Sequence, residues 1–276
     1  MKRLIILAIS AALITSACRK DIHLNLQNAS GILVIEGNIN DQPGPYSVFL
    51  SKSVTFYDSN NVVPVSGAAV IISDNIGNRD SLTEVSPGHY QTATITGTVG
   101  RTYQLHVSSE GKQYDATSIL HPPVAIDSTG VQFISFFGQT QIRPFIEFTD
   151  PAGIENYYKA FLYVYPYTPN TVPRGKQKRV SPVNDRLSDG ITIQTSVRAN
   201  DDLHTNDTLQ IELNAIDKAM YDYWATLNST TLSSQTAAPA NPPSNISNNA
   251  LGYFSAYAAV LSHHVVLDPA GFHRID

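Results

Sequence analysis

Cysteine is nearly absent from this sequence. Cys18 is the only one in 276 residues, so no disulfide can form within the chain. Charged residues are also scarce, at 15 %, which leaves few of the charged residues that favour helices. The 14 Tyr, together with abundant Thr, Val and Ile, favour strands instead. We therefore expect a β-rich fold whose stability comes from buried apolar area.

Signatures of catalysis and of nucleic-acid binding are missing too. The 18 basic and 23 acidic residues give a formal charge of −5, which argues against nucleic acid as a partner. The chain has no Gly-x-Ser-x-Gly nucleophile elbow and no glycine-rich phosphate loop. These absences favour a protein that is not an enzyme and has no catalytic residues, no cofactor and no bound metal.

The N-terminus has the pattern of a secretory signal. Lys2 and Arg3 precede an uncharged apolar stretch at residues 4–14, and small residues lead to Cys18. The apolar stretch is too short to cross the ~30 Å of hydrocarbon in a bilayer. Residues 1–17 are therefore expected to be a signal peptide that is removed.

The residues before Cys18 resemble the lipobox of bacterial lipoproteins, although Thr15 stands where that family most often has Leu. The resemblance implies that Cys18 carries a diacylglycerol and that its new amine receives a fatty acyl chain such as palmitate. A plain secretory signal with a chance cysteine is the alternative. Arg19, rather than Asp, favours the outer membrane. Lys20 and Asp21 resemble part of a Bacteroidota surface-export signal, so the cell surface is favoured over the periplasmic face. Residues 18–30 are interpreted as a tether.

Residues 31–121 have the pattern of an antiparallel sandwich. Short apolar or alternating runs follow one another, with turn chemistry at residues 74–77, 87–88 and 110–111. Tyr103 is a candidate tyrosine corner, with ordinary core packing as the alternative. Residues 64–70 (Pro-Val-Ser-Gly-Ala-Ala-Val) and 86–90 (Ser-Pro-Gly-His-Tyr) resemble transthyretin-like or carboxypeptidase-regulatory-like domains. This resemblance implies an Ig-like or transthyretin-like sandwich and no function.

A second β-rich domain is expected at residues 122–276, after the rigid connector His121-Pro122-Pro123. An aromatic strand is predicted at residues 160–165, and one main helix near 215–229. Asn214 is predicted to cap that helix. Trp224, the only tryptophan, is predicted to anchor it on a sheet.

For four groups of residues, a functional interpretation competes with a purely structural one. His263 and His264 are adjacent and therefore point to opposite faces of a strand, which opposes a shared metal. The oxygen-rich residues 200–207 lack the pattern of an EF-hand loop. The basic residues 174–179 are interpreted as a solvated loop, with lipopolysaccharide or a partner as the alternative. The tyrosines of residues 157–167 are either sugar-stacking residues or cross-strand pairs.

The whole pattern resembles the Bacteroidota lipoprotein family known as domain of unknown function 4249. The segments that carry the resemblance are the lipobox and residues 35–37, 64–70, 148–158, 221–224 and 245–254. It implies an outer-membrane lipoprotein that acts as an accessory or ligand-binding partner of a TonB-dependent nutrient-uptake receptor. Contact with the receptor is expected through loops around residues 166–190 and 233–249, and the ligand is a small molecule or a glycan. The alternatives are a surface structural or adhesive lipoprotein and a secreted hydrolase.

Overall fold

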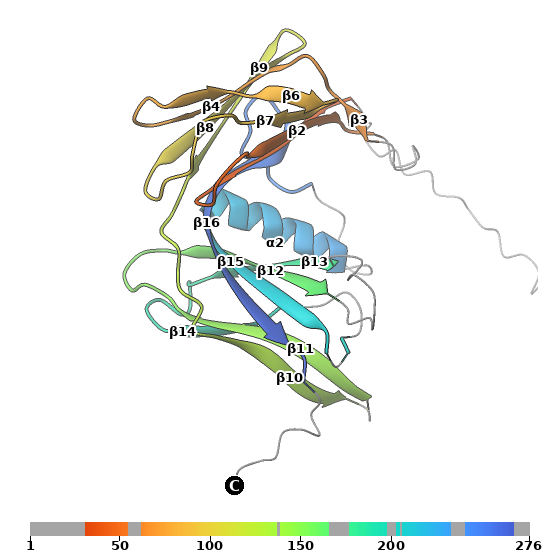
Figure 1. Ribbon diagram of the computed structural model, residues 1–276, viewed down its shortest axis with the longest axis vertical. Helices are drawn as coiled ribbons and strands as arrows, with labels where there is room; N and C mark the ends of the chain where they lie inside the picture. Colours follow the sequence, from red (N-terminus) through yellow and green to blue (C-terminus); the bar gives the residue numbers. More distant parts are fainter. Residues whose placement is uncertain are drawn as a thin grey trace, which may run out of the picture.

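The protein is represented by a computed structural model that describes residues 31–54, 62–136, 139–165, 177–197, 203–204, 206–232 and 241–267. The expected signal peptide, Cys18 and the tether lie outside the described residues. The described part is mainly β, with one helix, and its strands form two stacked sandwiches (Figure 1). The predicted fold class is therefore confirmed.

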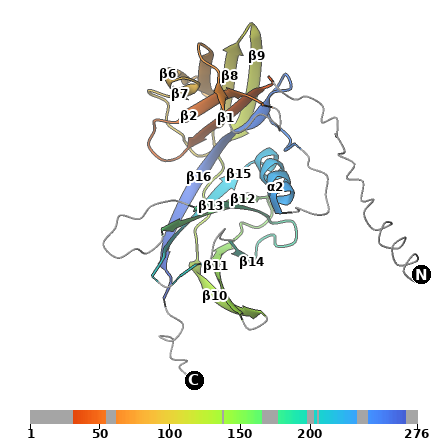
Figure 2. The same ribbon diagram turned by 90° about the vertical axis from the view of Figure 1, so that its right-hand side faces the viewer.

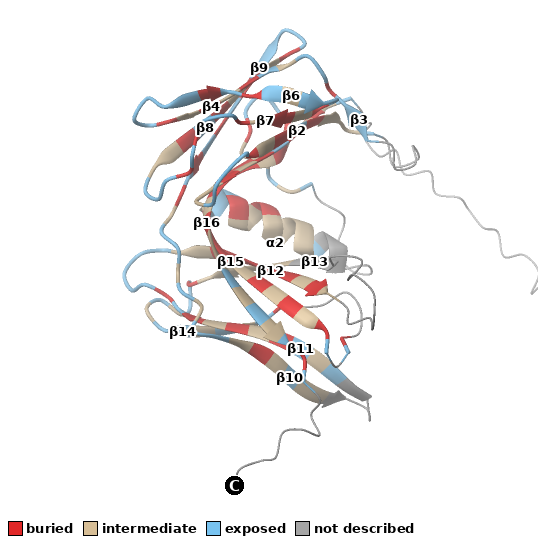
Figure 3. Cartoon of the chain, in the orientation of Figure 1, coloured by how far each residue is buried: buried red, intermediate tan, exposed pale blue. Residues whose placement is uncertain are grey.

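The first sandwich is built from nine strands in two facing sheets. One layer has the order β1-β2-β7-β6, with β3 beside β2 (β1 Leu33–Asn40, β2 Ser47–Lys52, β3 Val63–Pro64, β6 Thr83–Ser86, β7 His89–Gln91). The other has the order β5-β4-β8-β9 (β4 Ala69–Asp74, β5 Arg79–Ser81, β8 Thr102–Ser109, β9 Lys112–Ile119). Burial alternates along β8 because Tyr103, Leu105 and Val107 point inward to the shared core. Figure 3 shows such buried positions along the facing strands.

Three tyrosine hydroxyls tie strands of this sandwich to backbone outside the ladders. Tyr103 donates to the carbonyl of Thr96 (3.2 Å) and accepts from the N–H of Thr98 (2.8 Å), so the tyrosine-corner interpretation is confirmed. Tyr46 and Tyr90 make equivalent pairs of backbone hydrogen bonds. Buried phenols need such partners, and here the bonds also hold the loops in place.

The second sandwich packs a four-strand layer on a three-strand sheet. The four strands have the order β13-β12-β15-β16 (β12 Tyr157–Tyr165, β13 Gln177–Asn184, β15 Thr208–Ile216, β16 Leu251–Val265). The smaller sheet has the order β10-β11-β14 (β10 Ser128–Phe136, β11 Gln139–Thr149, β14 Thr192–Ser196). A core that includes Phe148, Leu162 and Ile211 fills the space between them. Helix α2 (Lys218–Leu232) packs on the opposite face of the four-strand layer, against β13, β12 and β16, so this half has three layers.

Strand β16 joins one layer of the first sandwich and one layer of the second into a single nine-stranded sheet. Its residues 251–257 pair in parallel with β1, and residues 258–265 pair antiparallel with β15. Figure 2 shows β16 running from the first sandwich into the second. Phe254 and Ala256 are fully buried in the first core, although they lie in the range expected for the second domain. Strand β16 therefore belongs to both halves. The domain boundary at residues 121–123 remains a prediction.

The helix begins later than its pattern predicts. Residues 215 and 216 are still part of β15, where Ile216 pairs with Tyr157, and the helix starts at Lys218. Asn214 is a fully buried strand residue, so the prediction that it caps the helix is wrong. Asp217 directly precedes the helix instead. Its carboxylate accepts hydrogen bonds from the Ser118 hydroxyl and the Ile119 N–H of β9, which ties the helix start to the first sandwich.

Candidate functional site

The residues weighed from the sequence do not gather at one place. His263 and His264 pair with Gln210 and Leu209, so they lie on opposite faces of β16 as expected. Asp207 is buried and accepts a hydrogen bond from the His204 N–H (2.8 Å), which makes it a loop-fixing residue. Residues 174–176 and 200–202, and the side chains of residues 177–179, lie outside the described part.

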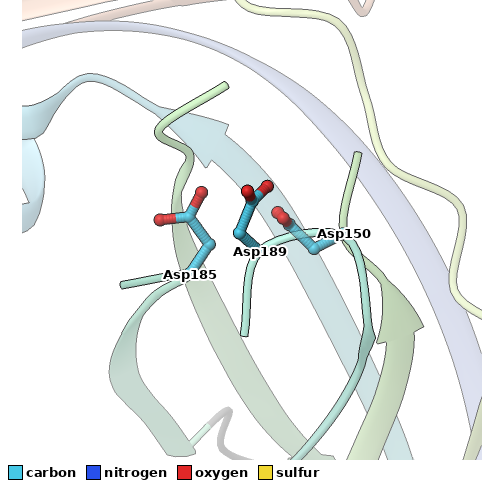
Figure 4. Close-up of side chains that lie close together, drawn as sticks. All are labelled: Asp150, Asp185 and Asp189. Carbon is cyan, nitrogen blue, oxygen red and sulfur yellow. The ribbon is translucent and has the colours of Figure 1, made fainter. Parts of the chain in front are cut away.

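A cluster of three carboxylates was not predicted. Asp150 follows β11, and Asp185 and Asp189 follow β13, so they come from two separate loops (Figure 4). Their candidate ligand atoms lie within 4.8 Å of one another. Asp150 accepts hydrogen bonds from the Tyr158 hydroxyl and the Gly190 N–H (3.2 Å). Asp185 accepts from the Asn156 N–H (2.7 Å), and Asp189 from the Gly153 N–H (2.7 Å). These bonds give the cluster a structural role in joining the two loops.

A pocket of about 210 Å³ lined by polar and aromatic side chains is the candidate binding site. It lies on the face of the long sheet that is turned away from the second core. Because side chains alternate along a strand, Phe161 and Tyr163 of β12 share this face with Glu212 and Gln210, their cross-strand partners on β15. Residues of β16 and β1 extend the wall into the first sandwich, so the pocket lies where the two halves meet.

Lys159 lies at the inner side of this pocket and is only 2 % exposed. Its Nζ is 4.4 Å from the ring centre of Phe161, 4.8 Å from that of Tyr257 and 5.1 Å from that of Trp224. Aromatic faces attract a cation, and this attraction offsets part of the cost of burying an ammonium group. Trp224 thus connects helix α2 to the pocket wall.

The phenols of the pocket act as neutral hydrogen-bonding groups. Burial, assisted by the nearby charge of Glu212, raises the pKa of Tyr257 to about 12. Burial and Glu212 also raise the pKa of Tyr163, whose hydroxyl donates to the Glu212 carboxylate (3.3 Å). Asn40 donates to the Tyr257 hydroxyl (3.3 Å). These hydroxyls therefore remain protonated at neutral pH and hold the polar side chains in place.

Buried polar groups continue inward from the pocket. Asn214 pairs in register with Lys159 on one side and Ala259 on the other, and both of these line the pocket. Within the described residues, the side-chain amide of Asn214 and the hydroxyl of Ser255 have no hydrogen-bond partner, although both residues are fully buried. Such groups are rare in folded proteins and indicate a region of unused hydrogen-bonding capacity.

The sequence indicated only part of this pocket. The alternation of aromatic residues along β12 was noted, with sugar stacking as one interpretation, but Asn38, Asn40, Gln210 and Glu212 were missed. These residues meet only because β1, β16, β15 and β12 are neighbours in one sheet. Strand order and register depend on contacts far apart in the chain, which a local pattern does not contain.

Residues 19–261 match the family described as Domain of unknown function (DUF4249). The chain belongs to the DUF4249 family. The DUF4249 match covers every residue that lines the pocket and all strands except the last four residues of β16. No curated protein matches the chain. Among the described residues of this DUF4249 chain, no helix is both long enough and apolar enough to span a membrane.

Proposed function

We propose that this chain is a non-enzymatic lipoprotein, anchored in the outer membrane by Cys18, that binds a ligand as an accessory partner of a TonB-dependent uptake receptor. The observation that carries the proposal is the polar and aromatic pocket at the junction of the two sandwiches. Ligand sites favour such junctions and combine aromatic walls with a few convergent polar groups. The proposal includes a Bacteroidota origin and exposure of the protein at the cell surface.

The first sandwich is proposed to be of the transthyretin-like type. The two motifs that suggested this type meet in space, because the Tyr90 hydroxyl donates to the Val65 carbonyl (3.2 Å) and accepts from the Ala68 N–H (3.0 Å). In this proposal the first sandwich is a rigid support that adds β1 to the sheet carrying the pocket.

The composition of the pocket favours binding over hydrolysis. Among the described residues that line it, Glu212 is the one carboxylate, and the Tyr163 hydroxyl already holds it. Glycoside hydrolysis commonly uses two carboxylates on either side of the scissile bond. The other polar side chains are carboxamides, phenols and Lys159, which suit recognition of a ligand.

Lipidation at Cys18 is testable directly. Cells grown with labelled palmitate should incorporate label into the wild-type protein and not into Cys18→Ser, which should leave the membrane fraction. A triacylated cysteine holds a protein firmly because several chains insert together. Equal labelling of the two proteins would contradict the anchor.

Partnership with a receptor is tested by recovering the tagged, full-length protein in mild detergent. A TonB-dependent receptor with a plug and a barrel, identified by mass spectrometry, is the expected partner. A version truncated at residue 121 is unsuitable because it removes β16 from the first core. Point variants of the full chain are therefore preferable.

Leu187 provides such a variant. It lies in the turn after β13, within one of the loops expected to contact the receptor, and it is 96 % exposed. Ile76, in the turn between β4 and β5 of the first sandwich, is 64 % exposed and serves as the matched control. Leu187→Asp should reduce recovery of the receptor, whereas Ile76→Asp should not. Equal recovery with both variants would refute placement of the contact on this loop, and recovery of no receptor by the wild type would refute the partnership.

A further inference from the structure

We propose that the pocket beside helix α2 binds one ring of a neutral saccharide. This inference rests on the proposed function, because it specifies the ligand that the accessory protein would bind. It is carried by three features of the pocket, which are its balanced charge, its tyrosine lining and the buried polar groups behind it.

Charge balance argues against an ionic ligand. Lys159 and Glu212 are the charged residues of the lining among the described residues, and their formal charges cancel. An anionic ligand would be attracted by Lys159 and repelled by Glu212, and a cationic ligand the reverse, so the pair favours neither sign of charge. Around them lie the carboxamides of Asn38, Gln42 and Gln210. A carboxamide both donates and accepts, so these groups match the hydroxyls of a neutral sugar, which also do both.

Aromatic side chains in the lining can make the apolar contacts that a saccharide needs. A sugar ring has an apolar face of C–H groups, which packs against the electron-rich face of an aromatic ring. Tyr163, Tyr253 and Tyr257 line the pocket and are partly exposed, so they are the aromatic residues that a ligand can contact. Phe161 is nearly covered and serves mainly to hold Lys159. The ligand is therefore expected to stack on tyrosine.

The buried groups behind the pocket are an independent observation. Asn214 and Ser255 are fully buried on β15 and β16, and their side-chain polar atoms have no hydrogen-bond partner in the described part of the chain. In strand register, Asn214 lies between Lys159 and Ala259 of the lining. Neither residue lines the pocket, so these groups make the floor behind it polar rather than contact the ligand directly, and a polar floor suits a polyhydroxylated ligand better than an apolar one.

The dimensions of the pocket limit the length of chain that it holds. Sites for drug-sized ligands measure roughly 300–1,000 Å³. A cavity of about 210 Å³ is smaller, so it suits a single ring, with the rest of an oligosaccharide extending outward. The open rim carries Gln42 and Leu261, which are exposed and can contact a second ring.

Binding can be read from the protein's own fluorescence. Trp224 is the only tryptophan, and its ring centre lies 5.4 Å from that of Tyr253 and 6.2 Å from that of Phe161 in the pocket wall. The full-length protein in mild detergent would be titrated with neutral tetrasaccharides of glucose, mannose, xylose and galactose. Heparin and chitosan tetrasaccharides provide the anionic and cationic comparisons. A saturable change in Trp224 emission is expected with at least one neutral tetrasaccharide and with neither charged one.

Two lining variants and one matched control place the binding in the pocket. Gln42→Ala and Glu212→Ala should each weaken binding by about fivefold or more, because each removes a hydrogen-bonding group from the ligand's surroundings. Gln113→Ala changes an exposed glutamine on β9 of the first sandwich and should bind like the wild type. Circular dichroism of each variant checks that it is folded.

Each outcome bears on the inference. Binding of a charged probe alone would overturn the neutral-saccharide class while leaving ligand binding intact. Saturable neutral binding that all three variants retain would overturn the pocket. No response to any tetrasaccharide at millimolar concentration would overturn the inference as well. Recovery of the receptor is a separate measurement, so a failed ligand prediction is distinguishable from a failed partnership.

Discussion

Two buried carboxylates, those of Asp74 and Asp80, accept backbone hydrogen bonds in the first sandwich. Asp80 is buried, and its Oδ2 accepts from the N–H groups of Ala93 (2.8 Å), Thr94 (2.6 Å) and Ile95 (2.9 Å). Burial alone would raise the pKa of this carboxyl, but the hydrogen bonds outweigh burial and lower the pKa below its ordinary value of 3.8. The charged form of Asp80 therefore stabilises the fold.

Replacing Asp80 with Ala should lower the free energy of unfolding by about 3 kcal/mol at pH 7, because three N–H groups, including that of the buried Ile95, lose their acceptor. Asp80→Asn should show a smaller loss, since its amide oxygen still accepts. Chemical denaturation monitored by circular dichroism measures both values. A loss below about 1 kcal/mol for Asp80→Ala would mean that the loop finds other acceptors.

The same carboxylate predicts a dependence on pH. A carboxyl whose folded pKa is lowered contributes stability above its unfolded pKa and loses it as pH falls through the folded pKa. Stability of the wild type should therefore decrease below about pH 4, and the decrease should be smaller in Asp80→Asn. Asp74 has a lowered pKa as well, because hydrogen bonds from Asn78 and Ile76 and the charge of Arg101 outweigh its burial, so part of the decrease should remain. Identical pH profiles for wild type and variant would contradict this account.

The sequence predicts the role of a residue when its hydrogen-bond partners lie nearby in the chain, and not when they lie far away. The Tyr103 corner and the turn at residues 74–77 were predictable because their partners lie within a few residues. Asp80 was not, because its partners lie 13 to 15 residues away and no local pattern marks them. The acidic cluster was missed for the same reason, since Asp150 and Asp185 come from different loops.

At the scale of elements, helix α2 depends on its aromatic contacts with the sheet. Met220 and Tyr223 are buried, and Trp224 is half-buried against the rings of Phe161, Tyr223 and Tyr253. The helical spacing of these residues correctly indicated the helix and its apolar face. Its start was misjudged because β15 continues to Ile216 with residues 213–216 all buried, and a strand and a helix can share the same apolar residues where they join.

Trp224→Ala should lower the free energy of unfolding by about 2–4 kcal/mol, because three ring–ring contacts and the cation–π contact with Lys159 are lost. Trp224→Phe should retain much of this stability. The measurement is urea denaturation followed by circular dichroism, with Lys218→Ala on the exposed side of the helix as a control of little expected effect. A loss below about 1 kcal/mol for Trp224→Ala would show that the helix is held mainly by Met220 and Tyr223.

At the scale of the whole molecule, β16 makes the two sandwiches interdependent. Its parallel pairing with β1 needs a glycine at Gly252, where φ is +92° and a Cβ would lie 2.0 Å from the Ile35 carbonyl oxygen. A second connection runs through Ser118, whose hydroxyl donates to Asp217 and accepts from the Ala256 N–H (2.7 Å). The sequence predicted two β-rich halves correctly, but it carried no sign that the last strand closes the first of them. That pairing joins residues more than two hundred positions apart.

This shared strand predicts that the protein unfolds as one cooperative unit. Separation of the halves would expose Phe254 and Ala256 from the first core and leave β1 without its parallel partner. Trp224 emission reports the second half, whereas circular dichroism reports the strands of both, so their urea midpoints should coincide. Gly252→Ala should disturb the pairing of β1 with β16 and lower both midpoints together. Two separate midpoints in the wild type would instead indicate that residues 31–121 and 122–276 fold independently. The pairing of β16 with β1 would then form only after each domain has folded.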